Sequence, residues 1–100
     1  MSISGTEVRE AIATSVTAND DALTAEVTDG RTITVPIAWF PRLAHGTREQ
    51  RSNWRFIGGG VGIHWPDLDE DISVESLLTG GRSGETQESF RHWLQARKIT

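Results

Sequence analysis

The chain has 100 residues, no cysteine, 10 basic and 14 acidic side chains, and a net charge of −4. This length accommodates one small domain, and the lack of thiols excludes a disulfide framework, a zinc–thiolate site and a cysteine nucleophile. No apolar run approaches the about 20 residues of a membrane span, and the first residues do not resemble a signal peptide. We therefore expect a cytoplasmic protein. Its acidic balance argues against nucleic acid and anionic membranes and favours a basic protein partner.

Three strands are predicted in the first third of the chain. Residues 11–18 are rich in β-branched side chains, which favour extended backbone. After the turn-forming run 19–21, apolar and polar residues alternate through 23–28, as in a half-buried strand. A third strand is expected to end near Pro36, because proline cannot donate a ladder hydrogen bond.

The connection between the second and third strands determines their register. Asp29 and Gly30 mark a reversal, but a two-residue loop would place the apolar side chains of the two strands on opposite faces. We therefore predict a three-residue loop with Gly30 in the left-handed conformation, which pairs Ala25 with Ile33.

Two short helices are predicted next. Pro41 suits the first position of a helical turn, with Leu43 and Ala44 facing inward. Thr47 and Gln50 match a capping box, in which their side chains satisfy free amides at the start of a helix extending to about residue 53.

A second hairpin is predicted at residues 54–57 and 61–65, which flank three consecutive glycines. If those glycines form a three-residue loop, Gly62 lies opposite Phe56. This register puts one set of side chains on the first face of the hairpin: Arg55, Ile57, Val61, Ile63 and Trp65. It puts a second set on the other face: Trp54, Phe56 and His64.

The last third of the chain contains an acidic run, a glycine-rich segment and a second helical pattern. The acidic run 67–71 leads into a short helix at 74–78, where carboxylates suit the positive end of the helix. We expect a single domain at 1–80, and the glycine-rich residues 81–85 are expected to be a mobile linker. Residues 86–100 then predict an amphipathic C-terminal helix, whose Phe90, Trp93 and Leu94 share one face.

The predicted fold class is α+β. Its parts are a small antiparallel β-meander, a second hairpin, short helices that pack against them, and the C-terminal amphipathic helix.

Several motifs occur in an order that is typical of one family: Asp29-Gly30-Arg31, Val35-Pro36, Trp39-Phe40-Pro41-Arg42-Leu43, Asn53-Trp54, Gly62-Ile63-His64-Trp65-Pro66 and Leu68-Asp69-Glu70-Asp71-Ile72. Over roughly residues 11–80 the sequence resembles the bacterial family called domain of unknown function 2442, and Trp93-Leu94 with Arg97 resembles the tail of many members. The resemblance implies a small α+β domain, found alone or fused to a helix-turn-helix domain, with no established enzymatic activity. Some members are encoded beside a small partner, in a pattern like a toxin and antitoxin pair.

His64 and the acidic run 67–71 are the first candidate for chemistry, because imidazole and carboxylates can bind a divalent metal or exchange protons. The run lacks the register of a calcium loop, and no second histidine follows at i+4 to complete a zinc pair. We therefore interpret Leu68 and Ile72 as core anchors, with the acids facing solvent or capping the helix. We assign no catalytic residue, metal or cofactor, and keep a small metal-assisted enzyme as an alternative.

A second candidate combines arginines with aromatic residues, as single-stranded nucleic acid sites do. It comprises Arg42, Arg48, Arg51, Arg55, Trp39 and Trp54. A helix that ends near residue 53 would interrupt the arginine stripe, and acids lie close by, so we favour salt bridges over nucleic acid. The glycine run lacks the Gly-Lys-Ser ending of a phosphate loop, and no serine lies in a nucleophile elbow.

The leading hypothesis is a non-enzymatic protein-binding or regulatory module, such as the antitoxin-like member of a pair. Its partner is expected to be a small basic protein that contacts the following residues: Trp39, Arg42, His64, Trp65, Asp69, Glu70 and Asp71. A further alternative is a homodimeric regulator that assembles through the C-terminal helix face of Phe90, Trp93 and Leu94.

Overall fold

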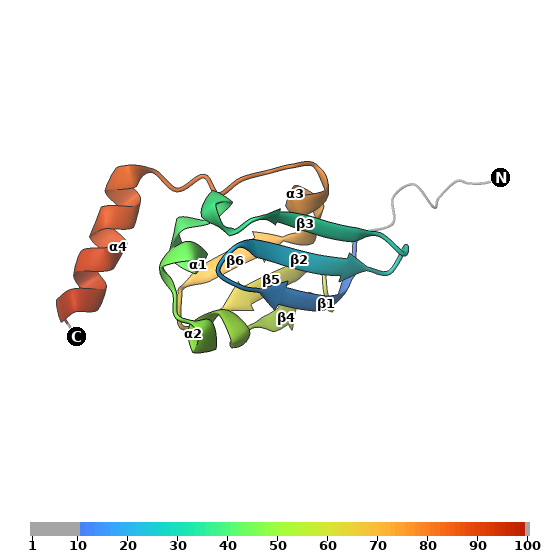
Figure 1. Ribbon diagram of the computed structural model, residues 1–100, viewed down its shortest axis with the longest axis horizontal. Helices are drawn as coiled ribbons and strands as arrows, with labels where there is room; N and C mark the ends of the chain where they lie inside the picture. Colours follow the sequence, from blue (N-terminus) through green and yellow to red (C-terminus); the bar gives the residue numbers. More distant parts are fainter. Residues whose placement is uncertain (1–10, 100) are drawn as a thin grey trace.

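The structure is a computed structural model that describes residues 11–99. Two three-stranded antiparallel sheets form its body, and in each sheet the strands follow one another in chain order (Figure 1). Sheet A has the order β1-β2-β3, with bounds Ala13–Ala18, Ala22–Val27 and Thr32–Pro36. Sheet B has the order β4-β5-β6, with bounds Arg55–Ile57, Gly62–Trp65 and Glu70–Ser73. The predicted α+β class is confirmed.

Short helices connect and flank the sheets. A 3₁₀ turn at Ile37–Trp39, helix α1 at Pro41–His45 and helix α2 at Arg48–Ser52 lead from sheet A to sheet B. Helix α3 at Val74–Leu78 follows β6, and helix α4 at Gln87–Ile99 ends the described chain. Figure 1 shows α1 and α2 at one end of the sheets, with α4 lying outside them at the same end. None of the helices within the described residues is long and apolar enough to cross a membrane.

The predicted register of sheet A is confirmed. Ala25 pairs with Ile33, and the Val27 amide donates to the Arg31 carbonyl at 2.9 Å, which leaves residues 28–30 as the loop. Gly30 has φ +98°, the left-handed conformation that the loop requires. The apolar side chains of β2 therefore share the inner face of the sheet.

The predicted register of the second hairpin is wrong by one residue. Ile57, not Phe56, lies opposite Gly62, and Phe56 pairs with Ile63. Gly58, Gly59 and Gly60 all have positive φ, and Val61 joins them in a loop of residues 58–61. The longer loop puts Phe56 on the same face as the buried Ile63, where it packs against the core, and it leaves Arg55 and His64 together on the outer face.

Sheet B also contains a strand that was not predicted from the sequence. Residues 66–69 form a turn in which the Leu68 amide donates to the Trp65 carbonyl at 3.2 Å, and β6 then returns along β5. Ile72 points inward from β6, whereas Asp71 and Ser73 are exposed. Ser73 ends this strand and caps α3, because its hydroxyl accepts the Ser76 amide at 3.1 Å.

The helices α1 and α2 begin as predicted. Pro41 occupies the first turn of α1, and the capping box of α2 joins the Thr47 hydroxyl to the Gln50 amide at 3.1 Å and the Gln50 side chain to the Thr47 amide at 2.9 Å. Leu43 is buried as expected, but the expectation for Ala44 is wrong because its side chain is exposed. One further residue around the helix is enough to turn it from the core toward solvent.

One core holds both sheets together. It combines Leu23 and Ala25 of sheet A with Ile63 and Trp65 of sheet B, all with exposed fractions of 1% or less. The two sheets are also joined through the backbone, since the Ala13 amide donates to the Gly60 carbonyl at 2.8 Å.

Arg51 is a charged residue within this framework, and only 5% of it is exposed. Its guanidinium donates to the carbonyls of Leu43, at 3.2 Å, and Gly46, at 2.6 Å, and pairs with the Asp20 carboxylate. The Arg51 carbonyl in turn accepts the indole N–H of Trp65 at 3.0 Å. The salt-bridge interpretation of the arginines is therefore confirmed for Arg51.

Candidate functional site

The structure separates the predicted partner-binding residues into three places. Trp65 lies in the core with an exposed fraction of 0%, so this fold removes it from the predicted partner surface. Four others gather beside residues 81–85, namely Trp39, Arg42, Asp69 and Glu70. His64 and Asp71 lie on the outer face of sheet B.

Arg42 fastens residues 81–85 to the domain. Its Nε and Nη2 donate to the two carboxylate oxygens of Glu85, each at 2.7 Å, while Nη1 donates to the Asp69 carbonyl at 2.8 Å. Only 6% of the Glu85 side chain is exposed, and its carboxylate also accepts the Ser89 hydroxyl at 2.8 Å. The hydrogen bonds from Arg42 hold the pKa of Glu85 below its usual range. We call these contacts the Arg42–Glu85 clamp.

The clamp leads into an aromatic contact between α1 and α4. The Arg42 guanidinium lies 5.0 Å from the ring centre of Trp93, and His45 meets both Phe90 and Trp93 edge-on at 6.2 and 5.8 Å. Arg97 donates to the Asp67 carbonyl at 2.8 Å. Of the predicted helix-interface residues, Phe90 and Trp93 thus contact their own domain at α1, and Leu94 is half-buried.

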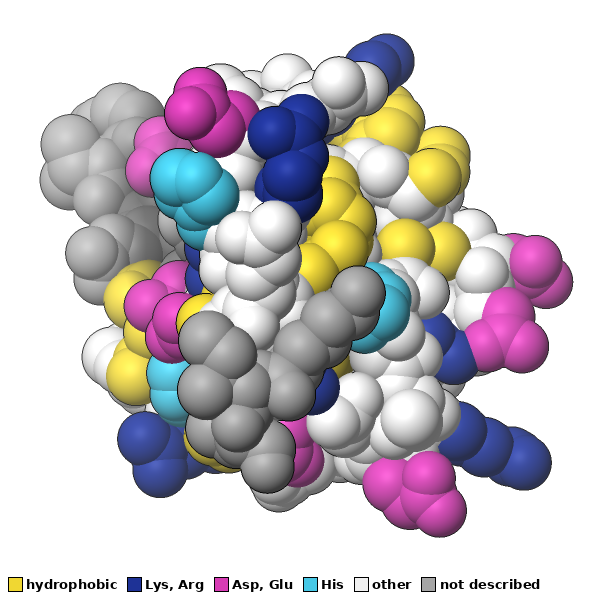
Figure 2. Space-filling view, turned by 90° about the vertical axis from the view of Figure 1, so that its left-hand side faces the viewer, with side chains coloured by type: hydrophobic (Ala, Val, Ile, Leu, Met, Phe, Trp, Pro, Cys, Tyr) yellow, Lys and Arg dark blue, Asp and Glu magenta, His cyan; other side chains and the backbone are white. Residues whose placement is uncertain are grey.

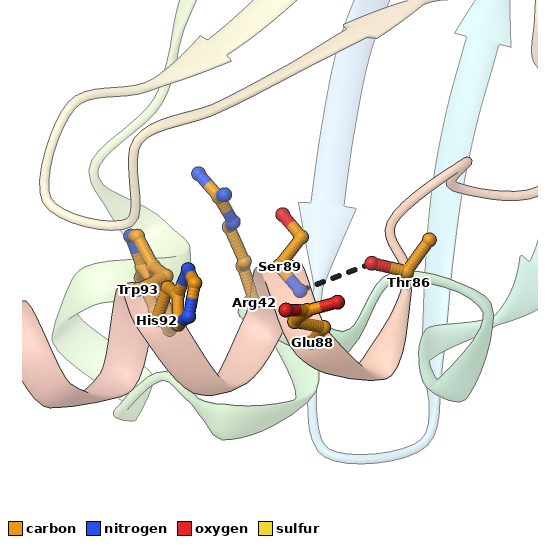
Figure 3. A pocket seen from close by; sticks show the side chains of 6 residues that line it. All are labelled: Arg42, Thr86, Glu88, Ser89, His92 and Trp93. Carbon is orange, nitrogen blue, oxygen red and sulfur yellow. Dashed lines mark hydrogen bonds between the residues drawn. The ribbon is translucent and has the colours of Figure 1, made fainter.

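A groove of about 540 Å³ runs between α1 and the start of α4, and its lining residues are drawn in Figure 3. They are Arg42, Thr86, Glu88, Ser89, His92 and Trp93. Figure 2 looks onto this end of the molecule and shows acidic, basic and histidine side chains interspersed with small hydrophobic areas. Because Glu85 and Asp69 already engage the Arg42 guanidinium, this groove offers no open cation to an anionic ligand.

Glu70 is the first residue of β6, beside the clamp, and is half-buried. Burial raises the pKa of its carboxyl group from 4.5 to about 7, although the charge of Arg42 acts in the opposite direction. The nearby carboxylates of Glu85, Asp71 and Asp69 add to the rise. This side chain therefore changes its charge near neutral pH.

The outer face of sheet B carries a row of charged side chains that crosses its three strands. Arg55 on β4 pairs with His64 on β5, which pairs with Asp71 on β6. The His64 Nδ1 atom and a carboxylate oxygen of Asp71 form a hydrogen bond. The Asp71 side chain keeps 67% of its surface exposed, so it remains open to solvent beside this hydrogen bond.

A second groove, of about 470 Å³, lies next to this row. It could not be predicted from the sequence, because its residues come from the segment before β1, from β4, β5 and β6, from the glycine loop and from α3, and they become neighbours only through the register of sheet B. They are Ala11, Ile57, Val61, Gly62, Asp71, Ile72, Ser73 and Glu75. We call it the sheet B groove.

The acidic run does not converge on a common centre. Asp67 accepts the Asn53 side-chain amide at 2.9 Å, Asp69 faces Arg42, and Asp71 faces His64. Within residues 11–99, no group of three or more histidine and carboxylate side chains is arranged to hold a metal ion. The geometry thus gives the metal-assisted alternative no supporting observation.

Comparisons with known proteins agree with this description. Two solved structures share the fold. A crystal structure of a protein of unknown function from Rhodospirillum rubrum has a TM-score of 0.66 and 23% identity, and covers 80% of this chain and 96% of that chain. A solution NMR structure of an uncharacterised protein from Chromobacterium violaceum has a TM-score of 0.62 and 22% identity, and covers 81% of this chain and 75% of that chain.

The curated proteins offer no match to this chain. Neither structural relative carries a stated activity. The family model described as protein of unknown function DUF2442 matches residues 13–83, which include both sheets and helices α1 to α3. The chain therefore belongs to the DUF2442 family.

Proposed function

We propose that the chain is a non-enzymatic protein-binding module that recognises a basic protein partner through the outer face of sheet B. The observation that carries the proposal is the exposure of this face. Ile57 is 42% exposed, the Asp71 side chain is 67% exposed, and Arg55 and Ser73 also face solvent. An apolar side chain surrounded by polar and charged groups is typical of a recognition surface.

Charge supports a basic partner. The chain has a net charge of −4, and exposed carboxylates of Asp71 and Glu75 lie at the β6 side of this face. Complementary charge accelerates encounter and disfavours acidic competitors. On the basis of the family resemblance, we further propose that the chain is an antitoxin-like regulator and that its partner is a small protein encoded nearby.

The homodimer alternative receives less support. Phe90 and Trp93 contact His45 of the same chain, and Glu85 is clamped by Arg42 of the same chain. These contacts already occupy part of the helix face that assembly through α4 would use.

Affinity capture from nuclease-treated host lysate tests the function. The wild-type chain should retain a single small basic protein in near-stoichiometric amount. The variant Asp71→Lys/Glu75→Lys should lose it, with a nearly unchanged thermal midpoint, because both side chains are exposed. These positions are preferable to Glu70, which is half-buried beside Arg42.

A matched control is Glu26→Lys/Glu49→Lys, which changes the net charge equally at exposed positions on β2 and α2. It should retain the partner. Loss of the partner from both variants would indicate a general charge effect and refute the assignment to sheet B. Capture of no protein by the wild-type chain would refute the binding function.

A further inference from the structure

The sheet B groove has an apolar floor. Ile57 leans over Gly62, where an added Cβ atom would lie 3.0 Å from the Ile57 Cγ1 atom. The missing side chain at residue 62 thus lets Ile57 lie flat against the strand, and Ala11 and Val61 extend the apolar surface. This floor suits the methylene stem of a long side chain.

One wall of the groove is polar and acidic. Asp71, Ser73 and Glu75 follow one another along β6 and the first turn of α3. Asp71 is bound to His64 through one oxygen only, and no described residue pairs with the exposed Glu75 carboxylate. The described lining contains no lysine or arginine to neutralise the two acids.

We propose that the sheet B groove binds a lysine or arginine side chain on an extended segment of the protein partner, an inference that rests on the proposed function. The aliphatic stem lies on Ile57 and Val61, and the charged end reaches the carboxylates of Asp71 and Glu75. Long basic side chains combine an apolar stem with a charged end in this way. An acidic segment or a nucleic acid would meet the same carboxylates with repulsion.

An NMR titration of the full ¹⁵N-labelled chain tests the inference. The probe is an acetylated and amidated valine–lysine–valine–lysine–valine pentapeptide, and its counterpart carries glutamine in place of lysine. The lysine peptide should shift the amide signals of Ile57, Gly62 and Ser73, and the glutamine peptide should bind at least fivefold more weakly. Glu75→Gln and Asp71→Asn should each weaken binding of the lysine peptide about two- to fivefold, as expected for an exposed ion pair.

Controls identify the occupant of the groove. Glu26→Gln, on the outer face of sheet A, should leave the affinity unchanged. Arg9→Ala should also leave the affinity for the lysine peptide unchanged. A large gain in affinity would mean that the chain's own first residues compete with the peptide for the groove, and that result would overturn the proposal. Amide shifts at these positions that grow with protein concentration in the absence of peptide would point to a second copy and overturn it as well.

The remaining outcomes separate this inference from the proposed function. Equal affinity for the two peptides, or shifts confined to other surfaces, overturns the groove assignment even if lysate capture succeeds. Peptide binding in the groove combined with failure to capture any protein overturns the assignment to a protein partner.

Discussion

The ionisation of Glu70 offers a quantitative test of the electrostatics around the clamp. In the unfolded chain its carboxyl group should titrate near the ordinary pKa of 4.5, whereas burial raises the pKa in the folded chain to about 7. Between these pH values the folded state holds a proton that the unfolded state has released. The contribution of Glu70 to the free energy of unfolding is therefore most favourable below about pH 4.5 and falls as the pH rises to about 7.

The size of this effect follows from the two pKa values. A rise from 4.5 to about 7 corresponds to at most about 3.4 kcal/mol, at about 1.36 kcal/mol for each pH unit. Because Glu70 is only half-buried, solvent screening reduces the expected effect to about 1–2 kcal/mol. Glu70→Gln should thus stabilise the chain by about 1–2 kcal/mol at pH 8 and by close to zero at pH 4.

Urea unfolding of the wild-type chain and the Glu70→Gln variant at pH 4 and pH 8 measures this difference. Comparison at each pH cancels the titration of other groups that the two chains share. A variant that is less stable than wild type at pH 8 would show that the ionised carboxylate is stabilised by Arg42 more than burial destabilises it. That result would refute the reasoning, as would a stability difference that is independent of pH.

Three other substitutions test the framework. Arg42→Ala should leave the buried Glu85 carboxylate without its partner. Hydrogen exchange of the α4 amides should then accelerate about tenfold or more, while exchange of the β2 and β5 amides stays unchanged. Uniform acceleration across all of these amides would contradict a local clamp. Gly60→Ala should lower the free energy of unfolding in urea by more than about 2 kcal/mol, because φ is +112° and the new Cβ would lie 2.8 Å from the Ala13 carbonyl oxygen. Gly59→Ala should lower it by only about 1 kcal/mol, because φ is +72° but the space around the new Cβ is open. Equal losses in the two variants would argue against a close contact at residue 60. Arg51→Met should lower the free energy of unfolding by about 1–3 kcal/mol, because the Gly46 carbonyl loses the guanidinium donor, whereas the Leu43 carbonyl still accepts the Gly46 amide. An unchanged urea midpoint would show that water replaces the guanidinium there.

Elements determined by neighbouring residues could be predicted from the sequence. The three-residue loop at Gly30 follows from the alternation on both sides of it, and the capping box of α2 lies within four residues. The glycine run was harder, because three interchangeable glycines allow several loop lengths with similar backbone cost. The observed register packs Phe56 beside Ile63 and places the Gly60 carbonyl against the Ala13 amide, and both contacts come from outside the loop.

Features that depend on distant contacts could not be predicted. Strand β6 contains a single inward apolar residue, Ile72, so its alternation is hidden within an acidic run. The burial of Trp65 in the core could not be predicted, because the acceptor of its indole N–H, the Arg51 carbonyl, lies in another element of the fold. The Arg42–Glu85 clamp joins residues 43 positions apart and leaves no local signal in the sequence.

The chain-order pairing of both sheets has a consequence for how the protein folds. Every strand pairs only with a strand that is adjacent in the chain, so each sheet closes short loops at a small cost in chain entropy. The shared core then needs a longer-range event, the meeting of the two meanders around the Leu23 and Trp65 side chains. Local pairing of this kind is typical of fast formation, so we expect the rate-limiting step to be the docking of two locally formed halves rather than the formation of either sheet.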